Sequence, residues 1–122
     1  MVTMNRIELI GHIGHPLDVH CSSDGRLTVR FHLATDRPSA PGTTPAADWH
    51  QVVCWGKLAE VAVQSVATGH LVYVAGRLSY RRWLGTDGRT RHATEIIASD
   101  VLLLGRSSRD LPDEGTAEQV AS

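Results

Sequence analysis

The chain of 122 residues has few aromatic side chains and almost no net charge. Aromatic residues make up 5% of it, and the formal net charge is −1 with His neutral. This balance excludes binding of a polyanion through bulk positive charge. Residues 1 to 105 hold ten Lys and Arg against nine Asp and Glu, so a basic surface must come from where individual cations are placed.

Long apolar runs are also missing. No stretch of about 18 apolar residues exists, so we expect no membrane span, and no apolar segment opens the chain, so we expect no export. The only two cysteines, Cys21 and Cys54, are too far apart for a zinc motif or a disulfide framework. Two reduced thiols in a cytoplasmic protein are the expectation, and a pairing of either thiol between subunits stays open.

The polar residues do not form a catalytic or metal-binding pattern. The seven His include His12 and His15, but an offset of three puts these two on opposite faces of a strand, which is poor metal geometry. The sequence shows no nucleophile elbow, no phosphate-binding glycine loop and no paired carboxylates beside a base. We therefore predict a protein that is not an enzyme and uses no metal and no cofactor.

What the sequence does contain is alternation of apolar and polar residues. In RLTVRFHLAT the apolar residues Leu27, Val29, Phe31 and Leu33 share one face of a strand, and the opposite face is basic. The same reasoning along the chain predicts strands over 6–14, 26–35, 48–55, 70–80 and 95–104, a loop over 36–47, a helix over 57–68 and a hairpin over 81–95.

This order predicts an all-β fold. Five strands with one short helix between the third and fourth strands, and a long β-hairpin, are typical of the OB-fold barrel. We predict one such domain over residues 1–105, followed by a short disordered acidic tail over residues 106–122.

Two of the three Trp lie in the segment WHQVVCW. An even spacing places Trp49 and Trp55 on one face of a strand, about 20 Å apart. The rings either fill the core or are exposed for a partner. Exposure is favoured, because Gln51 lies between them on that face while the opposite face carries Val52 and Cys54.

Trp83 follows two arginines at the base of the predicted hairpin. A ring among Arg side chains is suited to stack on a base while guanidinium groups contact phosphates. A solvated hairpin whose arginines offset Asp87 and Glu95 explains the pattern equally well.

The segments NRIELIGHIGHPLDV, DWHQVVCWGKLAEVA, GHLVYVAGRLSYRRW and TEIIASDVLLLG, taken in this order, resemble the bacterial single-stranded DNA-binding protein family over residues 4 to 105. The resemblance implies an OB domain that assembles as a homotetramer, a dimer of dimers. It implies base stacking on Trp49, Trp55 and Trp83, a dimer-forming strand that contains Ile7 and Leu9, and a subunit interface near His50.

Two places depart from the family pattern. An aromatic residue often follows the strand that ends at Thr35, but here Arg37-Pro38-Ser39 occupies that place. The family's major members also have a long tail with an acidic tip closed by an aromatic residue, whereas here the acidic residues 110–114 are internal and the chain ends in Val-Ala-Ser. We therefore do not predict that this tip recruits other replication proteins.

We predict sequence-independent binding and protection of single-stranded DNA in replication, recombination or repair. Arg26 is a further candidate for phosphate contact. The full set of predicted nucleic-acid contacts is Trp49, Trp55, Trp83, Arg30, Arg77, Arg81, Arg82, Arg89, Arg91 and Lys57. Two alternatives stay open: a primosomal or RNA-binding OB protein, and an oligomeric scaffold with weak affinity for nucleic acid.

Overall fold

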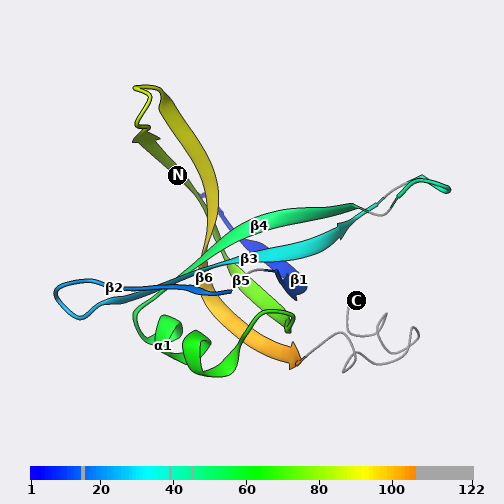
Figure 1. The fold of residues 1–122 in the computed structure, drawn as a ribbon, viewed down its shortest axis with the longest axis horizontal. Coiled ribbons are helices and arrows are strands. Elements are labelled where there is room, and N and C mark those ends of the chain that lie inside the picture. Colours follow the sequence, from blue (N-terminus) through cyan, green and yellow to red (C-terminus); the bar gives the residue numbers. More distant parts are fainter. Residues whose placement is uncertain (15, 39, 45, 107–122) are drawn as a thin grey trace.

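Six strands and one helix follow one another along the chain in the computed structural model, which describes residues 1–14, 16–38, 40–44 and 46–106. The elements are β1 (Ile7–Ile13), β2 (Asp18–Cys21), β3 (Leu27–Arg37), β4 (Ala46–Trp55), α1 (Gly56–Ser65), β5 (Leu71–Leu84) and β6 (Thr90–Gly105). The helix packs at one end of the strands, between β4 and β5 in the chain (Figure 1).

Five of the strands close into a barrel. Their hydrogen-bonded order is β1-β5-β6-β4-β3, and β3 returns to β1 through the pairs His12↔Ala34 and Ile13↔Leu33. The β4–β6 pairing is parallel and the others are antiparallel. This arrangement confirms the predicted OB-fold barrel with its helix between the long third and fourth strands of the ring.

The short strand β2 was absent from the sequence prediction. It pairs only with β3, outside the ring, and all four of its residues are exposed. Alternation of apolar and polar residues marks a strand that buries one face, so a strand with no buried face leaves no such signal.

The core forms where the predicted apolar faces meet. Val29, Phe31 and Leu33 of β3 are buried as predicted, together with Val52 and Cys54 of β4. Because successive side chains alternate across a strand, burial of Val52 and Cys54 directs the side chains of Trp49, Gln51 and Trp55 to the outside of the barrel.

The helix is shorter than predicted. It ends at Ser65, not at residue 68, and Val66 leaves it in an extended conformation with φ of −126°. Burial of Val66, which is 6% exposed, in the core explains the early exit. Ala59 and Ala62 form the buried side of the helix. Helical spacing predicts an apolar stripe that contains Val61, but this side chain is 44% exposed.

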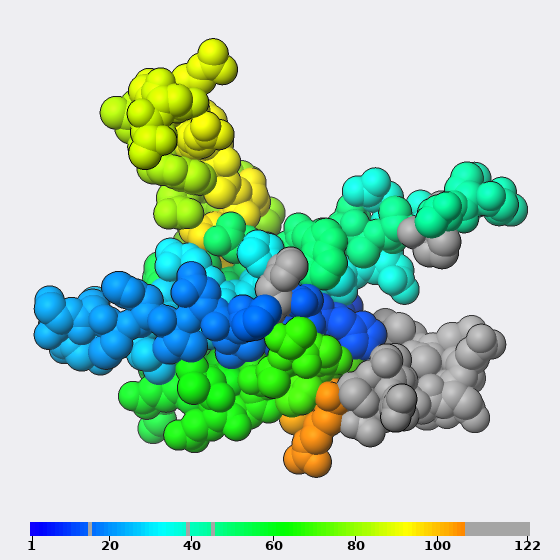
Figure 2. Space-filling model, viewed as in Figure 1, coloured from blue at the N-terminus to red at the C-terminus, as the bar shows by residue number. Residues whose placement is uncertain are grey.

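Two strand pairs extend beyond the barrel as arms (Figures 1 and 2). One is β3–β4, whose strands reach further into the predicted loop 36–47 than expected: they pair up to Arg37↔Ala46, and Arg37 donates to Asp48 Oδ1 at 2.8 and 2.6 Å. This ion pair stands at the place where the resembling family often has an aromatic residue. The other arm is β5–β6, paired out to Leu84↔Thr90.

A glycine inside a strand pattern predicts a bulge, and Gly76 of β5 lies at one. The register of β5 against β6 shifts between Ala75 and Gly76. A Cβ atom at Gly76 would lie 2.2 Å from the carbonyl oxygen of Ile97, so only glycine allows the two backbones to approach this closely.

The predicted acidic tail lies outside the described residues, apart from Arg106. Within the described part of the chain, no helix has the length and apolar character needed to cross a membrane.

Candidate nucleic-acid interface

The two Trp of β4 project from the barrel wall. Trp49 and Trp55 are each 53% exposed, so the prediction that their rings lie outside the core is confirmed. A strand of about 3.3 Å per residue separates the two positions by about 20 Å. The residues between them on the inner face, Val52 and Cys54, are fully buried, and they hold this segment of β4 on the wall.

The ring of Trp49 lies against the backbone of Gly14. A Cβ atom at position 14 would come within 2.0 Å of Cζ3 and 2.3 Å of Cη2 of the indole. Glycine is therefore needed at 14 for Trp49 to keep this orientation. The N–H of Gly14 also donates to the carbonyl of His32 at 3.0 Å, which fixes the end of β1 beneath the ring.

Strand pairing shows which other side chains share the outer face with Trp49 and Trp55, because paired residues point to the same side of a sheet. Thr28, Arg30 and His32 of β3 pair with Trp55, Val53 and Gln51 of β4. Ile97 and Glu95 of β6 pair with Val53 and Gln51, and Arg77 and Ser79 of β5 pair in turn with Ile97 and Glu95. Alternation then places Arg81 and Trp83 on this same face. One continuous surface, the outer face, therefore runs across four strands.

A buried carboxylate lies at the centre of the outer face. Glu95 is 4% exposed and forms ion pairs with Arg30 of β3 at 3.5 Å and with Arg81 of β5 at 3.4 Å. Strand β4 lies between β3 and β6, so the side chain of Arg30 crosses β4 to reach Glu95. This crossing lies over Val53, which is fully buried although its position belongs to the outer face.

Trp83 lies further out on the β5–β6 arm. It is 38% exposed, and the guanidinium carbon of Arg81 is 4.4 Å from the centre of its ring. This cation–π contact contributes about 0.5–1 kcal/mol at an exposed site and restrains the ring. Arg81 therefore links the buried Glu95 to the exposed Trp83. Near the tip, Arg91 pairs with Trp83 across the ladder and forms an ion pair with Asp87 at 3.0 Å.

Other predicted phosphate contacts are cations that form no ion pair with another residue described by the structure. These are Arg77, Arg82, Arg89 and Lys57. All four are exposed. Arg77 belongs to the outer face and Lys57 lies two residues after Trp55, at the start of α1, whereas Arg82 pairs with His92 on the opposite face of the arm. The structure thus places Arg77 on the same face as the two β4 rings and directs Arg82 away from that face.

The residues predicted at a subunit interface take different environments. Ile7 and Leu9 are partly buried and pack against the core. His50 is also partly buried, and its Nε2 lies 2.9 Å from the hydroxyl of Thr35. On the side away from β5, β1 pairs with β3 only at His12 and Ile13, so the backbone edge of residues 7–11 carries no ladder with any described strand.

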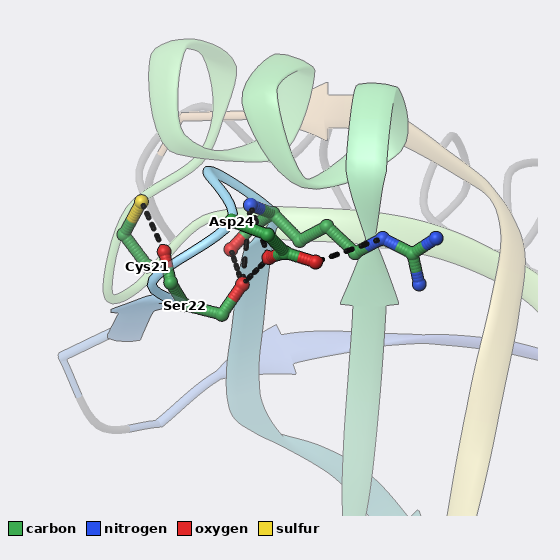
Figure 3. Close-up of polar contacts among 4 residues, drawn as sticks. Cys21, Ser22 and Asp24 are labelled. Carbon is green, nitrogen blue, oxygen red and sulfur yellow. Dashed lines mark hydrogen bonds and ion pairs between the residues drawn. The ribbon is translucent and has the colours of Figure 1, made fainter.

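The β2–β3 turn carries Arg26 and an exposed thiol (Figure 3). Ser22 and Asp24 bond to each other, and the backbone N–H of Arg26 donates to the hydroxyl of Ser22 at 3.2 Å. The hydrogen bond from Ser22 lowers the pKa of Asp24, which also pairs with Arg26 at 3.7 Å. Cys21 lies beside this turn, whereas burial raises the pKa of Cys54 to about 12, so Cys54 is an inert thiol.

Sequence reasoning missed two residues that shape this surface. Gly14 supports Trp49 through a contact 35 positions away in the chain, which no local pattern reveals. Glu95 was interpreted only as a charge that could offset the arginines of the hairpin. In the sequence, Glu95 only appears as a polar residue next to the apolar Ile96 at the start of the last predicted strand. This position does not show that two arginines from different strands converge on its carboxylate.

Comparisons with known proteins agree with this geometry. The model of the single-strand binding protein family matches residues 4–104. The single-stranded DNA-binding protein 1 of Chlorobaculum tepidum is 36% identical over 108 residues, covering 84% of this chain and 65% of the relative. The single-stranded DNA-binding protein 1 of Xylella fastidiosa is 34% identical over 110 residues, covering 87% of this chain and 81% of the relative.

A solved structure shares the fold. The Plasmodium falciparum SSB in complex with ssDNA superposes with a TM-score of 0.77 at 29% identity, covering 85% of this chain and 97% of that one. The chain spans just under two thirds of the length of the Chlorobaculum relative and most of the Xylella one. Sequence family, barrel and exposed rings therefore lead to one conclusion: this chain belongs to the single-strand binding protein family.

Proposed function

We propose that this protein binds single-stranded DNA without sequence preference and protects it during replication, recombination or repair. The observation that carries the proposal is the outer face itself: three exposed Trp side chains share it with Arg30, Arg77, Arg81 and Arg91. Base–aromatic stacking is tolerant of sequence because every base has a π face, and it is open only to unpaired bases. The binding involves no bond cleavage and no cofactor.

In this proposal both the barrel wall and the β5–β6 arm contact the DNA. Bases stack on Trp49 and Trp55 on the wall and on Trp83 on the arm. Phosphates contact the surrounding cations in turn, including Lys57, Arg89 and Arg82. Because each neutralised phosphate releases counterions, affinity falls with salt, with a slope of about −0.7 per phosphate for single strands.

We also propose that the protein acts as a homotetramer in the cytoplasm, associated with the nucleoid. The backbone edge of β1 that pairs with no described strand can form hydrogen bonds with the same edge of a second copy of the chain. Ile7 and Leu9 pack against the core and hold this edge in place. We include His50, which contacts the hydroxyl of Thr35, in a proposed subunit interface. Native mass spectrometry at several concentrations tests this; a monomer at all concentrations contradicts it.

Intrinsic Trp fluorescence during titration with oligo(dT), at low and high salt, tests DNA binding. We expect strong saturable quenching, with weaker binding at high salt. Competition with oligo(U) of the same length distinguishes DNA from RNA as the preferred ligand. No quenching at micromolar protein would contradict the proposal and favour the scaffold hypothesis.

A further inference from the structure

The β5–β6 arm has a second face that the outer face does not use. The side chains of Leu78 and Ile96 pair with each other and contact the core where the arm leaves the barrel. Beyond this point the same face continues as the pairs Tyr80↔Thr94 and Arg82↔His92, where the barrel no longer covers it. We call this the reverse face. A face that is core-lining at its base is therefore solvent-exposed along the arm.

The reverse face carries an exposed aromatic ring. Tyr80 is 77% exposed, the highest exposed fraction of any aromatic side chain among the large exposed hydrophobic residues of the structure. Its position on a strand ladder, between core contacts on one side and the arm's turn on the other, gives it no role in the core. A Tyr side chain combines an apolar ring with a polar hydroxyl, so the exposed ring is open to stacking by a partner.

A cavity of about 400 Å³ lies beside this ring, within the range of about 300–1,000 Å³ common for ligand clefts. It is lined by Tyr80, Arg81, Arg82, His92, Ala93 and Thr94. None of these residues is acidic, and Arg82 forms no ion pair with any residue that the structure describes. A flat ring, a free guanidinium and a hydroxyl are the groups that a nucleotide recognises: its base stacks, and its phosphate accepts from Arg.

The arm leaves a route from one face to the other. Tyr80 and Trp83 are three residues apart on β5, so their rings lie on opposite faces, about 10 Å apart along the strand. Strand β1 pairs with β5 only as far as Gly76, and the amide of Asn5 then bonds the backbone of Leu78 at 2.8 Å. Past Leu78 the edge of β5 meets no other described strand, so a flexible chain can pass around it.

We propose that the reverse face is a second stacking site, which takes one base of a single strand of DNA on Tyr80 and an adjacent phosphate on Arg82. The strand that stacks on Trp83 continues around the open edge of β5, so one arm holds DNA on both faces. This inference rests on the proposed function. It adds a stacking ring on the reverse face and a path for the DNA strand around the edge of β5.

Photocrosslinking tests the site directly. Oligo(dT) carrying 5-iodouracil is bound to the full chain, irradiated with long-wavelength ultraviolet light and digested, and the crosslinked residues are identified by mass spectrometry. We expect crosslinks at Tyr80 as well as at Trp83. Crosslinks at Trp83 alone would overturn the inference and leave the proposed function intact.

Affinity measurements distinguish a stacking role of the Tyr80 ring from an indirect effect of the substitution on folding. Tyr80→Ala should weaken oligo(dT) binding about 5-fold or more, Tyr80→Phe should restore it to within about twofold, and Arg82→Gln should reduce the salt slope by about 0.7. Val63→Ala, an exposed apolar residue on α1, is the matched control and should change nothing. If DNA quenches the Trp fluorescence of the wild type and Tyr80→Ala binds DNA as tightly as the wild type, the reverse face is not a DNA site. If the wild type does not bind at all, both proposals fail.

Discussion

The barrel wall and the β5–β6 arm present their aromatic rings in different ways. On the wall, the fully buried Val52 and Cys54 lie between Trp49 and Trp55 on the inner face of β4, and Trp49 also rests on Gly14. On the arm, Trp83 is held by a two-stranded ladder and by the cation–π contact with Arg81. The wall sets a fixed spacing between rings by means of the core. The arm has no core beneath it, and two-stranded ribbons of this kind are only marginally stable alone.

The cations do not divide in the same way. Arg30 on the wall and Arg81 on the arm both form ion pairs with Glu95. Cations without an ion pair to a described residue occur in both regions, for example Arg77 on the wall and Arg82 on the arm. The comparison teaches that the core fixes the stacking geometry of the wall, whereas both regions offer uncommitted positive charge. The predictions below test this comparison.

The largest expected effect concerns the rigidity of the wall. Cys54 lies on the inner face of β4, next to Trp55, and its pKa is raised to about 12 by burial. Since the thiolate is the reactive form, roughly one Cys54 in ten thousand is ionised at pH 8. We expect a thiol reagent to modify exposed Cys21 at once and Cys54 only on unfolding, as followed by mass spectrometry. Comparable rates at both thiols would mean that the wall opens and does not fix the ring spacing.

The next effect is loss of a ring on the wall. Trp55→Ala should weaken oligo(dT) binding by about 1–3 kcal/mol, or about 5- to 150-fold, because one base loses its stack. The melting temperature should change little, since the ring is 53% exposed. Trp55→Phe is the matched control and should retain most of the affinity. Unchanged binding by Trp55→Ala would show that this ring is structural.

A smaller effect is expected when the support of a ring is altered. In Gly14→Ala the new Cβ would overlap the ring of Trp49, which must move. We expect affinity to fall several-fold, but by less than in Trp49→Ala, and the double variant should bind like Trp49→Ala alone. Calorimetric titration of the three variants measures this. Additive effects would show that Gly14 acts on binding by some route other than Trp49.

The smallest effect is expected from the arm. Replacing Arg82 and Arg89 with Gln removes two proposed phosphate contacts, so the slope of log affinity against log salt should become shallower by about 1.4. This amounts to roughly a threefold smaller loss of affinity for each doubling of salt. Arg106→Gln, which removes one positive charge outside the arm, serves as a control for the loss of charge alone. An unchanged slope would place the phosphates on the wall only.

Much of the fold could be predicted from the sequence, because a strand with one buried face alternates apolar and polar residues. The inner face of β3, the outward direction of Trp49 and Trp55, and the bulge at Gly76 all follow from local patterns. The same patterns predicted the order of the elements, and the family resemblance agreed with that order. Strand β2 and the early end of α1 were not predicted, because an exposed strand has no periodicity and the exit of α1 depends on the burial of Val66.

Less of the site could be predicted from the sequence, for a related reason. Exposed rings and cations could be named from the sequence, but their partners could not. That Arg30 and Arg81 meet on Glu95 depends on the closed ring of strands, which brings residues 30, 81 and 95 to one spot. Alternation along β5 places Arg82 and Trp83 on opposite faces of the arm, but only the fold shows that the face of Trp83 is continuous with the barrel wall.

The buried carboxylate of Glu95 has a consequence for exchange. A phosphate that approaches Arg30 or Arg81 meets a cation that already has an anion, so it competes with Glu95 and not only with water. The gain on arrival is smaller, and on departure the arginine returns to a partner that is always present. In the proposed binding mode, Glu95 therefore competes with phosphate for these two arginines, and this competition favours release of the strand at the centre of the surface.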